Sequence, residues 1–286
     1  MTTDLIPPTP APAGPPPLPP EQRRGSARVV AIIAIVVGGA LILSAILSAV
    51  GSALWMTGAR GADGPRVADA GGISSLSLDV SAGDVAVVYA DVEEATLDVL
   101  GDGRGWRLER QGDQLRLSKH EPWWISWNGF DWNSDRVTLT LPQELADERL
   151  DARIDVSAGS VSIDGTYGDL DVHIGAGSAD VNGTADVLSV DLSAGGADID
   201  VADVSRGTLT VGAGELIASL TGTAPDELTI DVSAGSLVAS LPDDTYAVTS
   251  DVSAGELDNQ LSTSSDAPHR IDVQVSAGST TLRPTR

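Results

Sequence analysis

Apolar and polar residues alternate along most of the chain after residue 73. The alternation is clearest just before a recurring small-Ala-Gly triplet, as where Asp79-Val80 precedes Ser81-Ala82-Gly83. Period-two alternation predicts a β-strand with one face turned inward. A helix would need apolar residues three and four positions apart, which these segments lack. The pattern therefore predicts an all-β region.

The triplet recurs eight times, and a glycine ends each copy. These glycines are Gly83, Gly159, Gly177, Gly195, Gly214, Gly235, Gly255 and Gly278. From Gly159 onward, the steps between them are 18, 18, 19, 21, 20 and 23 residues. A period of this length indicates stacked supersecondary units. We expect the alanine of each triplet to face inward at the strand end, and the glycine to permit a tight corner.

A second, shorter strand follows each triplet, as at Val161-Ser162-Ile163, and turn residues such as Asp164-Gly165 end it. Two short strands cannot bury their own apolar face, whereas stacked copies can, at about 4.8 Å per rung. The predicted fold of residues 73–286 is a single-stranded β-solenoid, or β-helix, of about eight repeats. An immunoglobulin-like sandwich would need a central aromatic residue, and residues 151–286 contain no Trp or Phe.

The first 72 residues are of a different kind. Residues 1–27 are rich in proline and predict a disordered tail, either a plain spacer or a ligand for an aromatic groove. Residues 28–56 predict one uncleaved transmembrane helix, because the apolar run 29–56 has 28 residues and about 20 suffice to cross a bilayer. Its expected partner is the lipid bilayer. Residues 57–72 predict a flexible linker.

Charged residues that flank this helix and small residues within it predict its orientation and its self-association. Arg23, Arg24 and Arg28 precede the helix, which favours a cytoplasmic N-terminus and an extracellular C-terminal domain. Small residues recur at every fourth position of the helix and would let two helices approach closely, so a homodimer through this segment is a hypothesis. These residues are Ala40, Ser44, Ser48 and Ser52.

Composition excludes several classes of function. The net charge is -24, from 17 basic and 41 acidic residues, which argues against nucleic acid as a partner. The chain has no cysteine and three histidines, so thiol chemistry is excluded and imidazole sites are few. No GxSxG, P-loop or zincin motif occurs. We therefore predict no enzyme activity, no catalytic residue, no cofactor and no metal site.

Five aspartates occupy the position before the aliphatic residue that precedes a triplet. They are Asp79, Asp155, Asp191, Asp231 and Asp251. In a solenoid they would share one outward column, and stacked carboxylates repel one another. The column is expected to be either a solvated acidic face or a collector of calcium, although the calcium-binding nonapeptide GGxGxD is absent.

Residues 101–142 form an insertion between the first two triplets, and it holds most of the aromatic residues. Its candidate binding residues are Trp123, Trp124, Trp127, Phe130 and Trp132. The ends of a solenoid need a cap, so the cluster predicts a hydrophobic plug. The alternative is a membrane-interface or ligand-binding loop, because exposed tryptophans mark contact surfaces.

The DVSAG-type repeats, the leading anchor and the Trp-containing insertion together resemble the bacterial putative-adhesin domain of unknown function, over residues 73–286. The resemblance implies an envelope-associated β-solenoid of the toast-rack type and supplies no catalytic residue. The expected function is that of a membrane-anchored, surface-exposed, adhesin-like binding or structural module of the cell envelope. Its expected partner is an envelope polymer or a surface protein. The alternative is an envelope-stress sensor or regulatory protein that signals through its cytoplasmic tail.

Overall fold

The computed structural model describes residues 66–101, 103–119 and 135–285. Most of these residues lie in β-strands, with one short 3-10 helix, η2 (Gln143–Ala146), which confirms the all-β class. No helix in the described part is long and apolar enough to cross a membrane. The predicted tail (1–27) and transmembrane helix (28–56) lie outside the described residues, as do residues 57–65 of the predicted linker.

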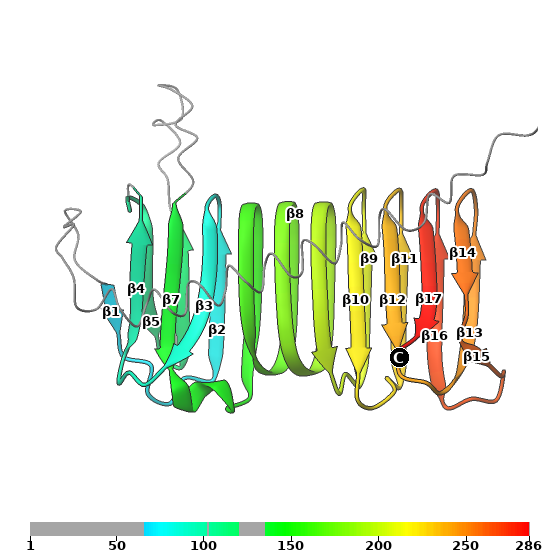
Figure 1. The fold of residues 1–286 in the computed structure, drawn as a ribbon, viewed down its shortest axis with the longest axis horizontal. Helices are drawn as coiled ribbons and strands as arrows, with labels where there is room; N and C mark the ends of the chain where they lie inside the picture. The colour runs from blue at the N-terminus through cyan, green and yellow to red at the C-terminus, as the bar shows by residue number, and fades with distance from the viewer. Residues whose placement is uncertain (1–65, 102, 120–134, 286) are drawn as a thin grey trace, which may run out of the picture. The chain divides into compact units, whose positions relative to one another are not determined.

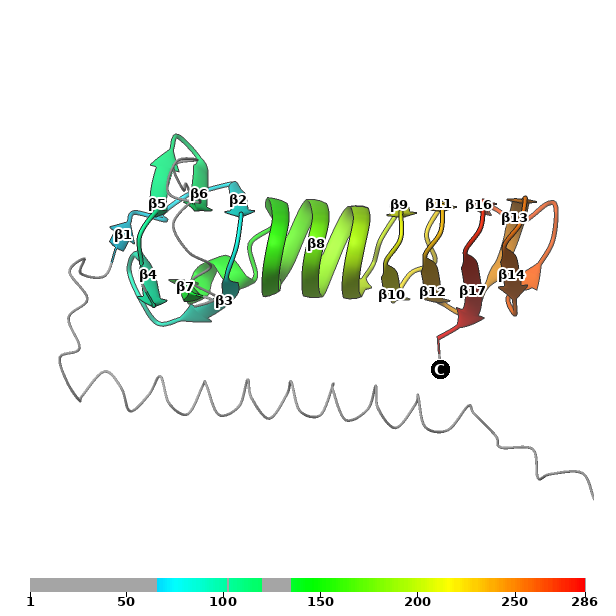
Figure 2. The ribbon, with the colours of Figure 1, turned by 90° about the horizontal axis from the view of Figure 1, so that it is seen from above.

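One row of strands forms a parallel ladder, visible edge-on in Figure 2. In spatial order its strands are β6 (Gln114–Lys119), β2 (Ser75–Val80), β8 (Leu150–Ala202), β9 (Arg206–Val211), β11 (Glu227–Val232), β16 (His269–Val275) and β13 (Thr245–Val252). We call its outward surface the first face. The long strand β8 winds back on itself several times, so that it contributes to both rows (Figure 1).

A second row forms a matching parallel ladder behind the first. In spatial order its strands are β7 (Arg136–Pro142), β3 (Asp84–Ala90), β8, β10 (Glu215–Thr221), β12 (Ser236–Leu241), β17 (Ser279–Pro284) and β14 (Glu256–Asn259). We call its outward surface the second face. Each repeat thus sends one strand to each row, and its triplet forms the corner between them.

Short strands complete both ends of the stack. At the end nearer the N-terminus, β5 (Trp106–Gln111) adds antiparallel to β6. On the other row, β4 (Ala95–Leu100) adds antiparallel to β7, and β1 (Arg66–Ala68) adds antiparallel to β4. At the opposite end, β15 (Ser262–Thr263) covers only the first two residues of β13.

The core lies between the two rows and is built from the inward columns. One such column is aliphatic in almost every rung, and its members are almost fully buried. They are Leu78, Ile154, Val172, Val190, Leu209, Ile230 and Val273. Each such side chain contributes about 1.5–3 kcal/mol relative to an exposed position. The narrow space between the rows explains why aliphatic residues, rather than tryptophan, fill it.

The corner differs from the expectation in one respect. The alanines of the triplets do not face the core; Ala158, Ala213 and Ala234, for example, are exposed. The chain already turns at the triplet, and its backbone pairs with the next rung, as where Ala213 N–H donates to the Ser193 carbonyl over 2.9 Å. Because the backbone changes direction at the triplet, the alanine methyl points to solvent. The last inward residue is therefore the aliphatic one before the triplet.

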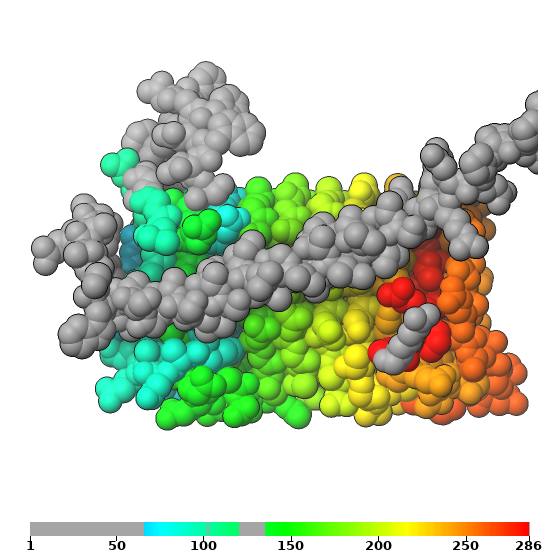
Figure 3. All heavy atoms as spheres, viewed as in Figure 1, coloured from blue at the N-terminus to red at the C-terminus, as the bar shows by residue number. Residues whose placement is uncertain are grey.

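The last two repeats are stacked in reverse order. Strands β16 and β17, which end the chain, lie between β11–β12 and β13–β14. In Figure 3, red C-terminal atoms accordingly lie between orange segments. The rung at the end of the stack carries Ser250 and Asn259 in register with the buried Val273 and Leu282. Polar inward residues suit a rung that has solvent on one side.

Candidate functional site

The five aspartates of the repeats share one outward column on the first face. Register pairs Asp79 with Asp155, and Asp231 and Asp251 each with Gln274. Thr210 lies between Asp191 and Asp231. The corner glycines stack in the order Gly159, Gly177 and Gly195, which places His173 between Asp155 and Asp191.

Carboxylates therefore alternate with uncharged or imidazole side chains over most of this column. From Asp155 onward the spatial order is Asp155, His173, Asp191, Thr210, Asp231, Gln274, Asp251. His173, Thr210 and Gln274 thus interrupt the column of carboxylates in this stretch, and neighbouring acids are two rungs, or about 10 Å, apart. Only Asp79 and Asp155 are direct neighbours.

Arginines compensate for that one pair of neighbouring carboxylates. Arg116 lies 3.4 Å from Asp79, and Arg153 contacts Asp155 at 3.0 Å and Asp171 at 2.8 Å. The hydrogen bond and charge of Asp155 raise the pKa of Arg153, and Asp171 raises it further. Among the described residues, no group of three or more His, Asp or Glu side chains is arranged to hold a metal ion.

A second outward column runs beside the acidic one, two residues earlier in each strand. In its middle it carries Ser189, Thr208, Thr229 and Asp272 in successive rungs. Together with Asp191, Thr210, Asp231 and Gln274, these side chains cover the first face with hydroxyl, amide and carboxylate groups. Such groups accept or donate hydrogen bonds at a regular spacing of about 4.8 Å.

The described residues include the base of the aromatic insertion. Lys119 and Asp135, which bracket residues 120–134, approach to 3.2 Å, with side chains only 7% and 5% exposed. The Trp106 indole N–H donates to Asp135 over 3.0 Å, and the Lys119 ammonium lies 5.5 Å from the centre of the Trp106 ring. The predicted binding residues Trp123, Trp124, Trp127, Phe130 and Trp132 lie outside the described residues.

No sequence motif marks this buried ion pair. The signal was present in the alternation of β6, because Leu115 and Leu117 are buried and Lys119 follows on the same side. A lysine on the apolar side of a strand requires a partner, since an isolated buried charge is costly. Its partner Asp135 is 16 residues further along the chain, and strand periodicity alone does not identify such a contact.

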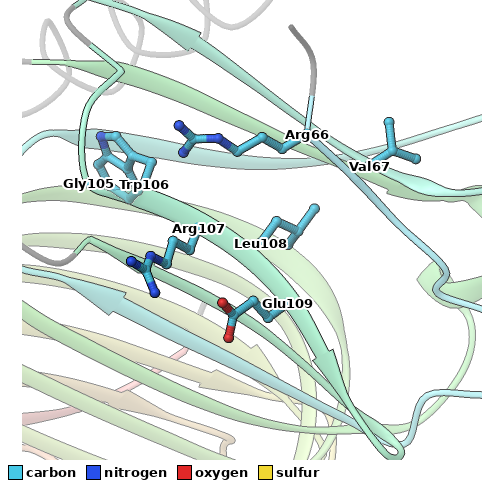
Figure 4. Close-up of a pocket in the computed structure, with 7 residues that line it drawn as sticks. All are labelled: Arg66, Val67, Gly105, Trp106, Arg107, Leu108 and Glu109. Carbon is cyan, nitrogen blue, oxygen red and sulfur yellow. The ribbon is translucent and has the colours of Figure 1, made fainter. Parts of the chain in front are cut away.

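Two open cavities lie on the described surface. The larger, of about 540 Å³, opens between β1 and β5 at one end of the stack and is lined by Arg66, Val67 and residues 105–109 (Figure 4). The smaller, of about 350 Å³, includes Arg206, Glu227 and Arg270, which are consecutive in one column. Neither lining includes a histidine or a lysine.

Three tyrosines in the described part stay neutral at physiological pH. Burial raises the pKa of Tyr89 to about 12, and Asp164 contributes. Burial likewise raises the pKa of Tyr167 well above its ordinary value, and that of Tyr246 to about 12. The Tyr246 hydroxyl donates to the Pro242 carbonyl over 2.8 Å. These phenols pack within the corners of the stack, and their raised pKa values make them weak acids.

The sequence matches no protein-family model and none of the curated proteins. Solved structures that resemble the fold include a putative adhesin from Bacteroides fragilis, with 14% identity, a TM-score of 0.42, and coverage of 77% of this chain and 96% of that one. A putative adhesin from Parabacteroides distasonis has 16% identity and a TM-score of 0.44, over 78% and 96% of the two chains. A putative lipid-binding protein from the same organism has 13% identity and a TM-score of 0.35, over 79% and 98%.

Proposed function

We propose that the chain is a membrane-anchored, surface-exposed, adhesin-like module, built as a β-solenoid, that binds an extended polymer of the cell envelope. The two parallel ladders, joined rung by rung through the glycine corners, support the solenoid architecture. The observation that carries the proposal is the first face, where the same outward positions repeat over successive rungs.

An extended ligand fits a repetitive face better than a compact ligand does. Each rung offers a hydroxyl or carboxylate group at about 4.8 Å from the next, so a polymer can make many weak hydrogen bonds in series. Linked weak contacts add up to useful affinity through effective concentration. The net charge of -24 disfavours strongly anionic polymers and favours a hydroxyl-rich polymer such as a glycan, whose hydroxyls donate to carboxylates.

The test uses purified peptidoglycan sacculi as the glycan probe and the full chain in detergent micelles. We expect the sacculi to retain the chain on sedimentation, and we expect Thr208→Lys with Thr229→Lys on the first face to abolish retention. The matched control places the same two charges on the second face, at Ser162 and Ser219. Absence of retention, or equal loss in both variants, would contradict the proposal.

The insertion is proposed to add either a cap or a second contact surface. Replacing Trp124 and Trp127 by serine separates these roles. A cap predicts loss of the cooperative unfolding transition, whereas a contact loop predicts a folded chain with weaker binding to sacculi or to lipid vesicles. Trp106→Ser serves as the control for a core residue, because Trp106 is 1% exposed and bonded to Asp135.

The anchor and its orientation are part of the same proposal. Since the chain has no cysteine, single cysteines at Thr9 and Thr57 report topology without background. A membrane-impermeant maleimide applied to intact cells is expected to label the Thr57→Cys variant and spare the Thr9→Cys variant. The reverse pattern would contradict the extracellular placement. Deleting residues 1–27 then tests the sensor alternative, which predicts a lost envelope response while sacculus binding persists.

A further inference from the structure

The stack ends in two strands, β13 and β14, whose outer edges are open. On its inner side β13 pairs with β16 along its length, whereas on its outer side β15 pairs only with Thr245 and Tyr246. Strand β14 pairs with β17, and no other strand among the described residues pairs with it. Open edges are templates for pairing with another chain, because their N–H and C=O groups have no partner in the sheet.

The hydrogen bonds near the two ends of β13 show which of its backbone groups point outward. The Tyr246 carbonyl accepts from the Ser264 N–H on the outer side over 3.0 Å, and the Ser253 N–H donates to the Val275 carbonyl on the inner side over 2.9 Å. Successive residues of a strand direct their backbone groups to opposite sides. The outer groups therefore belong to alternate residues after Tyr246, which are Val248, Ser250 and Val252.

Strand β14 offers a second, shorter row of outer groups. The N–H groups of Glu256 and Gln260 donate to carbonyls of the neighbouring rung over 2.9 and 2.8 Å, which places them on the inner side. By the same alternation, the outer backbone groups of β14 are those of Leu257 and Asn259. The longer row on β13 is therefore the better template for an added strand.

The residues with outer backbone groups direct their side chains toward the core. Val248, Ser250 and Val252 lie in register with buried residues of β16. Val248 and Leu257 pack partly buried against the core, whereas Val252 is 38% exposed. Side chains of a strand alternate between its two faces. A strand added to β13 would therefore place every second side chain over these apolar residues and the intervening ones beside the first face.

The outer faces beside this edge are acidic. Asp251 is exposed on the first face, and Glu256 and Asp258 are exposed on the second. Residues 243–285 contain seven carboxylate side chains and only two arginines. Opposite charges on adjacent strands favour pairing, and like charges oppose it. The intervening side chains of an added strand should therefore be lysine or arginine.

A second copy of this chain does not supply such a strand from either end of its stack. Two β13–β14 ends placed together would bring their carboxylates into contact, which opposes pairing. At the other end, residues 66–70 and 95–113 include the terminal strands β1, β4 and β5 and contain four arginines and five acidic residues. That end has no excess of positive charge, so the complementary segment belongs to another protein.

We propose that the β13–β14 end docks an extended segment of another protein, in which apolar residues alternate with lysine or arginine, as a strand added to β13. Backbone hydrogen bonds to Val248, Ser250 and Val252 supply affinity, and the alternation of apolar and basic side chains supplies specificity. The added strand covers the exposed Val252 and neutralises part of the acidic charge. This inference is independent of whether the first face binds a glycan.

The test uses a short fluorescent peptide in which lysine and valine alternate, and the full chain in a non-ionic detergent. Fluorescence anisotropy is expected to show saturable binding to the chain and none to empty micelles. A peptide of the same composition with all its lysines before all its valines should bind about tenfold more weakly, because its side chains do not match the two faces. Equal binding of the two peptides, or no binding of the alternating one, overturns the proposal.

Charge reversal tests the contribution of the acidic faces. Asp251→Lys with Asp258→Lys is expected to weaken binding of the alternating peptide about tenfold or more, because attraction becomes repulsion. The matched control, Asp231→Lys with Asp200→Lys, makes the same change of net charge in the middle of the two faces. It should weaken binding less than about twofold, because distant charges are screened. Equal loss in both variants would show attraction to the overall charge and would overturn the proposal.

A proline tests the backbone pairing. Ser250→Pro removes an outer N–H and leaves the inner hydrogen bonds of β13 in place, and an edge strand tolerates proline where the N–H faces solvent. We expect this variant, with its fold checked by circular dichroism, to lose peptide binding and Ser250→Ala to retain it. In the unaltered chain, the peptide should slow hydrogen exchange in residues 247–252 but not in β11. Normal binding by a folded proline variant, or unchanged exchange in residues 247–252, would overturn the proposal.

Discussion

Glycine at each corner is required because the backbone of the neighbouring rung leaves no space for a side chain. A Cβ on Gly195 would overlap the carbonyl oxygen of Gly177, and Gly195 has a φ of +103°. The same overlap recurs from rung to rung, as between Gly278 and Gly235. The repeat therefore retains glycine for two reasons, close approach and, at some corners, a backbone conformation that other residues avoid.

Two adjacent glycines provide a matched test of this argument. Gly195→Ala is expected to lower the free energy of unfolding by about 2–4 kcal/mol, from strain and overlap. A Cβ on Gly196 would make only an ordinary contact, at 3.8 Å from the Glu215 carbonyl oxygen. Gly196→Ala should therefore change the free energy of unfolding by less than about 1 kcal/mol. Chemical denaturation followed by circular dichroism measures both. Equal effects would show that crowding at the corner does not set the requirement.

A carboxylate on the second face predicts a pH dependence. Burial raises the pKa of Asp198, and the carboxylates of Asp180 and Asp200 raise it further. The folded state therefore binds this proton more tightly than the unfolded state, whose Asp pKa is about 3.9. Above the raised pKa of the folded state, ionised Asp198 lowers the free energy of unfolding by its full amount. Below the pKa of the unfolded state, the carboxyl is protonated in both states and this loss vanishes.

Asp198→Asn removes this cost. The expected result is a gain in unfolding free energy near pH 7 of less than about 1 kcal/mol, because the site is only half-buried. The gain should disappear below about pH 3.9, where the carboxyl is protonated in both states. Denaturation at both pH values checks this, with Asp98→Asn on the exposed surface of β4 as control. A gain that persists in acid would contradict the assignment.

At the scale of strands, the position of a repeat in the chain differs from its position in the stack. Strand β16 belongs to the last repeat, yet its inward residues Ile271, Val273 and Val275 are buried because it lies between β11 and β13. Strand β13 comes earlier in the chain but forms the end of its row, and its last four residues, 249–252, are exposed. Chain order would suggest that the C-terminal repeat frays first, whereas the stacking order predicts the opposite.

Substitutions of two valines test whether local stability follows chain order or stacking order. Val273→Ala in β16 is expected to cost about 2–3 kcal/mol, because Val273 is 1% exposed and surrounded by other rungs. Val252→Ala in β13 should cost less than about 1 kcal/mol, since Val252 is 38% exposed. Hydrogen exchange should likewise show slower exchange of β16 amides than of β13 amides. Faster exchange in β16 would argue for stacking in chain order.

At the scale of the whole molecule, the reversed order of the last two repeats preserves the alternation of charge on the first face. Gln274 lies between Asp231 and Asp251, which would be neighbours if the repeats stacked in chain order. Two carboxylates about 4.8 Å apart repel by about 1 kcal/mol even in water. The inserted rung thus separates like charges while it places the more polar rung at the end.

Gln274→Asp tests this role by creating three consecutive carboxylates in the column. The expected loss of unfolding free energy is about 1–2 kcal/mol at low ionic strength, and added salt should reduce it through screening. Gln274→Asn, which keeps the side chain neutral, should have a much smaller effect at any salt concentration. A loss that is insensitive to salt would indicate that packing rather than charge decides the preference at this position.

Local patterns were sufficient to predict much of the architecture. The second strand predicted at Val161-Ser162-Ile163 lies within β8, with Val161 and Ile163 buried. The residues before the triplets, such as Val156 and Val211, were correctly predicted to face inward and are buried in all copies except Val252, in the rung at the end of the stack. The alanines were not, because strand periodicity does not reveal where the backbone begins to turn. The partner of Lys119 and the cavity between β1 and β5 also escaped prediction, since both depend on segments distant in the chain.

The linear order of residues determines which side chains can face inward, where each corner must have glycine, and how strongly the domain is charged. All three depend on neighbours within a few residues, through the two-residue pleat of a strand and the absence of a Cβ. The interleaving of the last two repeats, the position of Gln274 between Asp231 and Asp251, and the pairing of Lys119 with Asp135 arise only from long-range contacts. Because the repeats are similar, more than one of them would fit a given position in the stack. Packing and charge between distant segments therefore decide which repeat occupies it.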